Sequence, residues 1–273
     1  MSRRLLALFL VLLTLMQFCA VPALAAEKDA DLPELPETEF APEEPAETEE
    51  LAAEAPMQDV AVYASGDIES ATTPFTYRML TDTTISIAAY RGTDAAVIVP
   101  ETIDGFTVTA LANYAFSGNT ALTSVTLADT ISAINYRAFY NCTSLSSVNI
   151  PKSWTTAGIE IFRGCKALTS VTVPEGMTAL PDSAFYGANG LQSVTLPATL
   201  TKLGTAVFED CTALQSIEIP AGVTEIPNSA FSGCTALTSV TLPDTVTSIG
   251  RYAFLATALS AIRVPDVVTT INY

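Results

Sequence analysis

The sequence has no histidine, one tryptophan, and only 12 lysine and arginine residues among 273. Without histidine there is no Ser-His-Asp triad, no Cys-His dyad and no histidine-ligated zinc. The basic residues are outnumbered by 29 acidic ones, and the net charge is −17. Nucleic-acid binding relies on Lys and Arg to displace counterions from phosphates, so we expect no nucleic-acid partner. These absences also argue against the common hydrolase chemistries.

The negative charge is concentrated in one short segment. Residues 27–70 hold 15 acidic side chains and one basic one, which gives −14, whereas residues 71–273 hold 14 acidic and 9 basic ones, which gives −5. From Glu27 to Asp59 the sequence is mostly Glu, Pro, Ala and Thr, with very few side chains that could form a core. Such a segment cannot offset its ordering entropy. We therefore predict that residues 26–70 form a disordered acidic Glu/Pro-rich linker. A calcium tether is the alternative, but the segment lacks ordered ligand spacing.

The first 25 residues have the features of an export signal. Arg3 and Arg4 precede the apolar run Leu5–Met16, and small residues follow up to Ala25. This pattern predicts a signal peptide over residues 1–25, and hence a secreted or cell-surface protein. A retained membrane anchor is the alternative, but Gln17 interrupts the apolar stretch. No later segment reaches the ~20 apolar residues that a membrane span needs, so we expect none in the mature chain.

A 23-residue repeat organises the rest of the chain. Seven phenylalanines are spaced 23 residues apart, and Leu, Val or Ile, and Pro recur six, nine and twelve residues after most of them. The repeat phenylalanines are Phe116, Phe139, Phe162, Phe185, Phe208, Phe231 and Phe254. The last repeat is one residue shorter after its phenylalanine.

Each repeat contains the pattern of a short β-strand. From Thr238 to Leu242, apolar and hydroxylated residues alternate, which is typical of a strand with one buried face. Pro243 then ends the strand, because proline has no N–H for the ladder. One repeat cannot bury its apolar face alone, but stacked repeats share a continuous core. We therefore predict a repeat solenoid over residues 71–273.

The repeated pattern L-x-S-V-x-I-P-x-x-V-T-x-I-x-x-x-A-F-x-x-C resembles the BspA-type leucine-rich repeat family of bacterial surface proteins. The match runs from about Thr84 to the end, and Ile98–Gly105 resembles the family's usual first coil. The resemblance implies a right-handed leucine-rich-repeat-like coil with short parallel strands, comprising about seven repeats and an N-terminal lead-in coil. It also implies a secreted or surface-attached interaction protein, for which adhesion to host matrix proteins or other cells is the role usually proposed. It identifies no ligand.

Four cysteines occupy one column of the repeat, three residues after the phenylalanine: Cys142, Cys165, Cys211 and Cys234. We expect them to be buried thiols that pack as small apolar side chains. Disulfides between neighbouring coils are the alternative, but parallel side chains in one column do not favour them. A zinc site needs four converging thiolates, and the coil of Ala188 separates the two pairs.

Trp154 departs from the repeat. It occupies a column otherwise held by Ile, Met, Leu and Val, and the small Ala157 stands where larger apolar residues recur. A large residue beside a small one conserves volume, so we interpret Trp154 as a core side chain. A ligand-stacking platform is the alternative.

The chain ends inside a repeat. Residues 268–271 begin another coil, and Asn272-Tyr273 matches Asn135-Tyr136, but the Ala-Phe pair of the repeat does not follow. A solenoid normally closes with a polar cap. We therefore expect the solenoid to be truncated at Tyr273.

Two groups of side chains are candidates for a recognition surface. The first, the strand ladder, alternates with the buried strand positions and consists of Thr126, Asn149, Thr172, Thr195, Glu218, Thr241 and Arg263. The second, the Tyr/Arg rim, lies beside the phenylalanine column and consists of Tyr114, Tyr136, Arg137, Tyr140, Arg163, Tyr186, Arg251 and Tyr252. Aromatic and arginine side chains are the usual anchors of specific binding. Each group also has a structural interpretation: the ladder as a solvated sheet face, and the rim as a cover for the edges of the core.

The residues favour binding over catalysis. The outward columns contain no paired carboxylates, activated nucleophile or phosphate-binding loop, so we predict no catalytic, metal-binding or cofactor-binding residues and no cofactor. We predict an adhesin-like protein that binds an extracellular protein or glycan of host or microbial origin through the solenoid surface. The alternative is a structural spacer or assembly module of the cell envelope without a soluble ligand.

Overall fold

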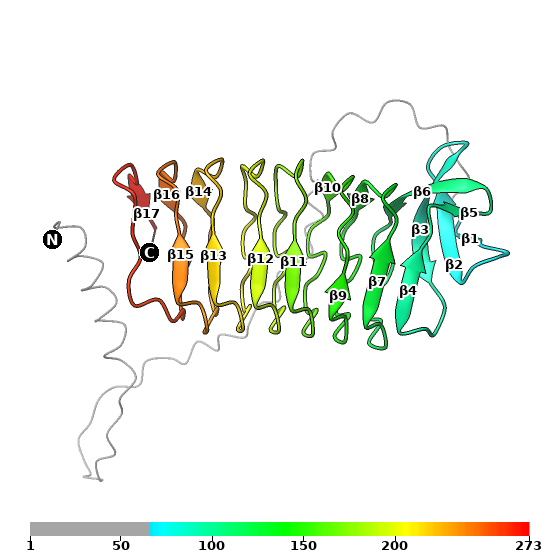
Figure 1. Ribbon diagram of the computed structural model, residues 1–273, viewed down its shortest axis with the longest axis horizontal. Helices are drawn as coiled ribbons and strands as arrows, with labels where there is room; N and C mark the ends of the chain where they lie inside the picture. Colours follow the sequence, from blue (N-terminus) through cyan, green and yellow to red (C-terminus); the bar gives the residue numbers. More distant parts are fainter. Residues whose placement is uncertain (1–65, 273) are drawn as a thin grey trace, which may run out of the picture. The chain divides into compact units, whose positions relative to one another are not determined.

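The computed structural model describes residues 66–272, which form a β-solenoid of stacked coils (Figure 1). All regular elements of these residues are β-strands. The lead-in coil and the 23-residue repeats follow one another along the solenoid axis, as the spacing of the phenylalanines predicts. The proposed signal peptide, nearly all of the acidic linker and Tyr273 lie outside the described residues.

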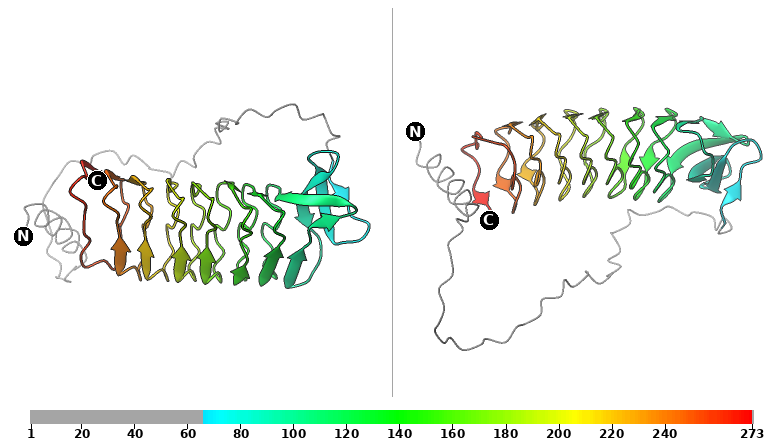
Figure 2. Two further views of the ribbon diagram at one scale, coloured as in Figure 1. Left: turned by 45° about the horizontal axis from the view of Figure 1, so that its top comes forward. Right: turned by 90° about the horizontal axis from the view of Figure 1, so that it is seen from below.

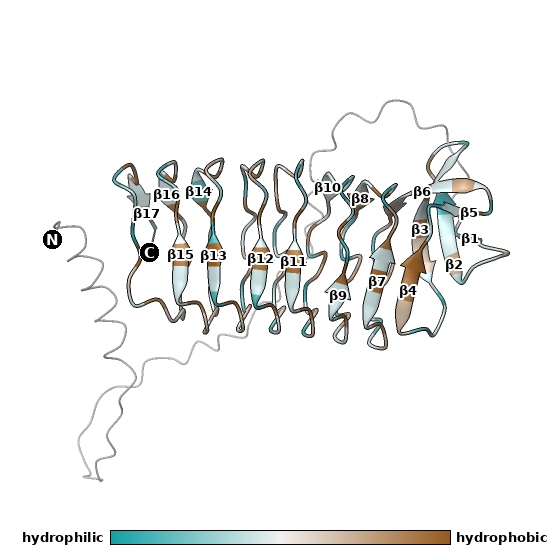
Figure 3. Ribbon diagram, viewed as in Figure 1, coloured by the Kyte–Doolittle hydropathy of each residue, from teal (hydrophilic) through white to brown (hydrophobic). Residues whose placement is uncertain are grey.

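The strand patterns of successive repeats form one row along the solenoid, the strand face. Its members are β4 (Ala96–Val99), β7 (Ser124–Leu127), β9 (Ser147–Val148), β11 (Ser170–Thr172), β12 (Ser193–Thr195), β13 (Ser216–Glu218) and β15 (Ser239–Thr241). Pairing is parallel and joins equivalent residues of adjacent repeats, as between Ser170 and Ser193. Figure 3 shows that β4 is more hydrophobic than the later strands of this row.

A second row of short strands follows the position that is proline in most coils and Ala128 in the first repeat. It contains β6 (Phe106–Leu111), β8 (Ala133–Ile134), β10 (Thr156–Ala157), β14 (Glu225–Ile226), β16 (Ser248–Ile249) and β17 (Thr270–Ile271). Between β10 and β14, a single bridge joins Ala179 and Lys202. In the last pair, Ser248 lies opposite Thr270, an offset of 22 residues. The final repeat is one residue shorter, and β16 and β17 still pair. The two other views follow both rows (Figure 2).

A β-hairpin that the repeat pattern does not predict covers the first coil. It consists of β2 (Phe75–Met79) and β3 (Thr84–Tyr90), and β1 (Ile68–Glu69) pairs with the outer side of β2. On its other side, β3 pairs in parallel with β6, which also pairs with β5 (Thr102–Ile103). Phe75 and Tyr90 contact the first repeat phenylalanine, Phe116, with ring centroids 6.4 and 5.8 Å away. The hairpin thus closes the N-terminal end of the core. It also corrects the linker prediction, because Ile68 and Glu69 pair with β2 although they fall within residues 26–70.

The repeat phenylalanines form a continuous stack through the core. Adjacent rings lie 5.1–5.6 Å apart between centroids, and their planes differ by no more than 13°. From Phe139 to Phe231 the side chains are completely buried, with 0% exposure. Aromatic pairs of this kind contribute about 0.5–1.5 kcal/mol each beyond their burial.

In the turn that carries each phenylalanine, the residues two before and two after it in the chain have left-handed backbone conformations. Two residues before it, all seven repeats have φ between 52° and 63°, as at Glu160. Two residues after it, φ lies between 54° and 74°, and glycine occupies four of these seven positions. These kinks let three N–H groups per coil donate to carbonyls of the next coil, as Glu160, Phe162 and Gly164 do at 2.8–3.0 Å. We call this side of the solenoid the turn face.

At the left-handed positions, we expect a change from glycine to alanine to destabilise the protein and a change from alanine to glycine to stabilise it. Gly118 has φ = 72°, and a Cβ added there would meet no atom within 4 Å, so Gly118→Ala should lower the free energy of unfolding by about 1 kcal/mol through backbone strain alone. Ala256, with φ = 55° and an exposed side chain, should give a similar gain when changed to glycine. Urea unfolding of both variants checks this. Equal effects of the same sign would contradict it.

Candidate functional site

All seven members of the strand ladder are exposed, as the alternation in sequence predicts. Two of them make specific contacts: Arg263 pairs with Asp244 at 2.8 Å, and the Asn149 Nδ2 donates to the Leu127 carbonyl at 2.9 Å. The others are mainly threonines, and the ladder contains no aromatic residue. It is a flat hydroxylated surface with one arginine near its C-terminal end.

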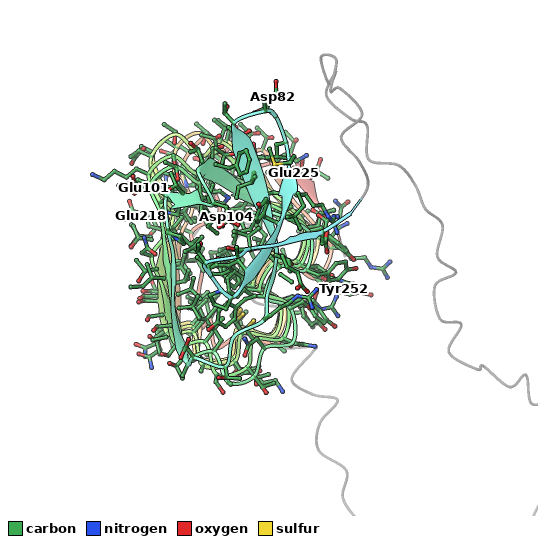
Figure 4. All side chains as sticks on the ribbon, turned by 90° about the vertical axis from the view of Figure 1, so that its right-hand side faces the viewer. Asp82, Glu101, Asp104, Glu218, Glu225 and Tyr252 are labelled. Atoms are coloured by element: carbon green, nitrogen blue, oxygen red, sulfur yellow. The ribbon has the colours of Figure 1, made fainter. Side chains whose placement is uncertain are left out.

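The Tyr/Arg rim lies on the opposite side of the solenoid. In the view along the axis, Glu218 of the strand ladder and Tyr252 of the rim lie at opposite edges of the coil (Figure 4). The rim belongs to the turn face, because its members occupy positions from two before to one after a repeat phenylalanine, with Arg251 and Tyr136 three before. Tyr114 and Tyr252 are each 47% exposed, whereas Tyr136, Tyr140 and Tyr186 are half-buried. The two candidate surfaces therefore cannot contact the same flat partner.

A buried carboxylate connects the centre of the rim. Glu160 is 7% exposed and accepts hydrogen bonds from Arg137 Nε, one coil earlier, and from Arg163 Nη1 in its own coil. Arg137 lies over the rings of Tyr136 and Tyr140, 4.8 Å from each centroid. The carboxylate and the rings together fix the orientation of both guanidinium groups. Glu160 is not among the candidates chosen from the sequence, although its position in the column of Arg137, one repeat later, is a signal for such a pair.

The rim continues across the next coils. Arg163 lies 4.4 Å from the ring centroid of Tyr186, and Arg251 lies 4.7 Å from that of Tyr252. At the other end, the rings of Tyr114 and Tyr136 meet edge to face at 5.3 Å. The structure therefore brings Tyr114, Tyr136, Arg137, Tyr140, Arg163 and Tyr186 into one network and leaves Arg251 and Tyr252 as a separate exposed pair three coils further along.

Burial keeps Tyr136 and Tyr186 of the rim protonated. Burial raises the pKa of Tyr186 above its ordinary value, and the carboxylates of Asp210 and Glu209 raise it further. Burial also raises the pKa of Tyr136, while the charge of Arg137 opposes the shift. Both hydroxyl groups are hydrogen-bond donors throughout the neutral pH range.

A shallow pocket of about 370 Å³ adjoins the rim. Tyr140, Arg163 and Tyr186 of the rim form one side of it. Its other lining residues were not singled out from the sequence: Asn141, Gly164, Lys166, Gly187, Asn189, Asp210 and Thr212. Three of the eight rim residues thus line this hollow. A concave site is a common setting for ligand recognition.

Comparison with known proteins identifies the family. The family model described as "BspA type Leucine rich repeat region (6 copies)" matches residues 83–214 and 155–273. The chain belongs to this family. The match covers the lead-in coil and the repeats, in agreement with the resemblance seen in the repeat pattern. A search of curated proteins found no match.

Solved structures of bacterial leucine-rich repeat proteins have the same fold. A Treponema pallidum leucine-rich repeat protein is 30% identical with a TM-score of 0.66, over 74% of this chain and 92% of its own. A leucine-rich cell surface protein of Faecalibacterium prausnitzii is 31% identical with a TM-score of 0.52, over 77% of this chain and 52% of its own. A Bacteroides ovatus leucine-rich repeat protein is 25% identical with a TM-score of 0.58, over 76% of this chain and 61% of its own.

In this BspA-type solenoid the four repeat cysteines are free and completely buried. Each thiol donates to the carbonyl of the phenylalanine one coil before its own, at 3.0–3.2 Å, as Cys165 does to Phe139. The prediction of buried thiols is confirmed, and the alternative of disulfides is not. The cysteine column therefore contributes hydrogen bonds between coils as well as packing.

Trp154 is a core residue of the BspA-type repeat. Its side chain is 1% exposed, and its Nε1 donates to the Thr156 carbonyl at 2.8 Å. The core interpretation is confirmed, because a buried ring offers no face to a ligand. As the only tryptophan, Trp154 also provides a fluorescence signal for unfolding.

Within residues 66–272, no group of three His, Cys, Asp or Glu side chains is arranged to hold a metal ion. The same residues contain no helix with the length and hydrophobicity required to cross a membrane. The turn face carries aromatic and cationic groups whose positions are fixed by contacts with one another.

The ion pairs of Glu160 with Arg137 and Arg163 should contribute to the stability of the protein. Glu160→Gln removes a charge that neutralises two arginines whose side chains are 30% and 34% exposed. Because solvent screens the arginines in part, we expect a loss of about 1–3 kcal/mol, less than for a fully buried pair. Unfolding by urea measures it, and Glu225→Gln, an exposed carboxylate on β14, is the matched control. Equal losses in both variants would contradict the role of Glu160.

Proposed function

We propose that this protein is a secreted or cell-surface binding protein without catalytic activity, adhesin-like, that recognises an extracellular protein or glycan through the turn face of its solenoid. The export signal predicted over residues 1–25 supports the location, as does the similarity to the F. prausnitzii leucine-rich cell surface protein. Membership of a family of bacterial repeat proteins supports a binding role.

The Tyr/Arg rim is the observation that carries the proposal. Tyrosine and arginine are enriched among residues that dominate binding energy, because they provide large contact areas and several hydrogen bonds at small entropic cost. In the rim, Arg137 and Arg163 are held by Glu160 before any partner arrives. A surface ordered in advance loses less conformational entropy on binding.

The strand ladder supports the proposal less well. Threonine is under-represented among residues that dominate binding energy. Hydroxylated side chains are also what a strand requires on its solvated side. The ladder therefore serves as the reference surface in the experiment.

The test compares the two faces of the purified chain on arrays of extracellular matrix proteins and glycans. One double variant alters the exposed end of the rim by Arg251→Glu and Tyr252→Ser. The matched control alters the ladder by Thr172→Lys and Thr195→Lys. Neither double change touches the core, because all four side chains are exposed. Circular dichroism verifies that both variants are folded.

The proposal predicts that the rim variant loses at least tenfold in affinity while the ladder variant binds as the unaltered chain does. Loss through the ladder alone would place recognition on the strand face and contradict the choice of surface. If neither change matters, or the chain binds nothing, the binding role fails. End-to-end association of the chain in light scattering, without any bound ligand, would then favour a structural module of the cell envelope.

A further inference from the structure

The pocket beside the rim has glycines in its floor. Its floor is the column two residues after the phenylalanine, where glycine occupies two adjacent coils, Gly164 and Gly187, between Asn141 and Asp210. A Cβ added at Gly187 would meet no atom within 4 Å, so the space above this residue is open. A Cβ added at Gly164 would meet the Asn141 Oδ1, so the Asn141 side chain covers that glycine. The open part of the floor therefore lies over Gly187.

Two columns of side chains form the walls. The residues after the phenylalanines provide phenol rings and a guanidinium group, from Tyr140, Tyr186 and Arg163. Three residues further along, the second wall provides the ammonium group of Lys166 and the amide of Asn189. A ligand in the pocket would thus meet aromatic rings on one side and polar groups on the other.

Several of these groups are fixed by other contacts. Arg163 is bonded to Glu160 and lies over Tyr186, 4.4 Å from the ring centroid. Asn189 Nδ2 donates to the Asp210 carbonyl at 2.9 Å, which leaves its amide oxygen as an acceptor. The arrangement is therefore preorganised, and a ligand does not have to order it.

The balance of charge indicates the class of ligand. Arg163 and Lys166 are opposed by Asp210 in the lining and by Glu160 behind it. A strongly anionic ligand would meet the Asp210 carboxylate, and an apolar ligand would leave several polar groups unpaired. The pocket instead suits a neutral ligand with a ring face and many hydroxyl groups.

We propose that this pocket binds a neutral saccharide unit of a glycan, an inference that rests on the proposed binding function and specifies its ligand. Its volume of about 370 Å³ lies near the lower end of the range of small-molecule sites, about 300–1,000 Å³. One or two sugar rings occupy the pocket, with a ring face against Tyr140 or Tyr186. Hydroxyl groups bond to Asn189, Lys166 and Asp210. The open mouth lets the rest of the glycan leave toward solvent.

The experiment uses an array of neutral, sialylated and sulfated oligosaccharides, followed by calorimetric titration with the neutral oligosaccharide that binds best. The test variant is Gly187→Ala, which puts a methyl group in the open floor. The matched control is Gly118→Ala, where φ is also positive and the added Cβ is also free of contacts. Both variants bear the same backbone strain, so a difference in binding reports the pocket. Lys166→Ala removes one wall group from an exposed position and provides a second variant.

We expect the unaltered chain and Gly118→Ala to bind a neutral oligosaccharide equally, Gly187→Ala to bind at least tenfold more weakly, and Lys166→Ala severalfold more weakly. Unchanged binding by Gly187→Ala and Lys166→Ala would overturn the inference, as would binding of sialylated or sulfated oligosaccharides alone. If no oligosaccharide binds but a matrix protein does through the rim, the pocket proposal fails and the proposed function stands. If nothing binds, both fail.

Discussion

Phe185→Ala should lower the free energy of unfolding by about 3–5 kcal/mol, the range for removing a fully buried aromatic side chain. Phe185 is 0% exposed and stacks on Phe162 and Phe208, at 5.5 and 5.4 Å between ring centroids. Its loss leaves a cavity in the centre of the solenoid and removes two aromatic contacts. Since typical domains are stable by only about 5–15 kcal/mol, this is a large fraction of the total.

The chain contains a matched control for this prediction. Phe254 is half-buried and stacks on Phe231 alone, at 5.5 Å. Phe254→Ala should therefore cost less than half as much as Phe185→Ala. Urea unfolding followed by the fluorescence of Trp154 measures both. Equal losses at the two positions would show that the stack does not stabilise the solenoid in the way we describe.

Alkaline pH should unfold the protein through its buried thiols. Burial raises the pKa of Cys142 and of Cys234 to about 12, and raises those of Cys165 and Cys211 well above the ordinary value. In the unfolded chain, a cysteine thiol has a pKa of about 8.5. Above that pH the unfolded chain loses protons that the folded chain retains, so stability is complete below about 8.5 and falls as the pH rises toward the folded pKa. Each thiol contributes up to about 1.4 kcal/mol per pH unit to this fall.

With four such thiols, the free energy of unfolding should fall by about 4–5 kcal/mol per pH unit between pH 9 and 11, enough to unfold a typical domain. The control is the variant with all four cysteines changed to alanine, which the coil of Ala188 shows to be an acceptable side chain in this column. Its stability starts lower but should fall much less with pH, because it lacks the four thiols whose pKa values burial raises. Parallel pH profiles for the two proteins would contradict the assignment.

Most of the fold follows from the sequence because one physical constraint applies to every repeat. A side chain at a given position of one coil contacts the side chain at the same position of the next coil. In the columns of Phe139, Leu145 and Cys142, equivalent side chains must therefore pack against one another. For this reason the period predicts the solenoid, the buried thiols and the outward strand ladder. The N-terminal hairpin lies outside the period. Phe75 and Tyr77 become core residues only because β2 folds onto the first coil.

The candidate site is less evident from the sequence. The period places Tyr140, Arg163 and Tyr186 in one column, so their gathering on one side is predictable. The role of Glu160 depends on a left-handed backbone, φ = 59°, that directs its carboxylate toward arginines of two coils. The pocket depends on the conformations of the side chains around Gly164 and Gly187. Neither follows from the identity of the residues alone.

The measurement that tests the central claim most directly is a radical footprint of the chain, free and bound to the protein or glycan that it retains on the arrays. Mass spectrometry reads the oxidation of individual side chains on both faces in one experiment. We predict that binding protects Tyr140, Tyr186 and Tyr252 and leaves β11, β12, β13 and β15 of the strand face unchanged. Protection confined to those strands, with the rim tyrosines oxidised as in the free chain, would contradict recognition through the turn face.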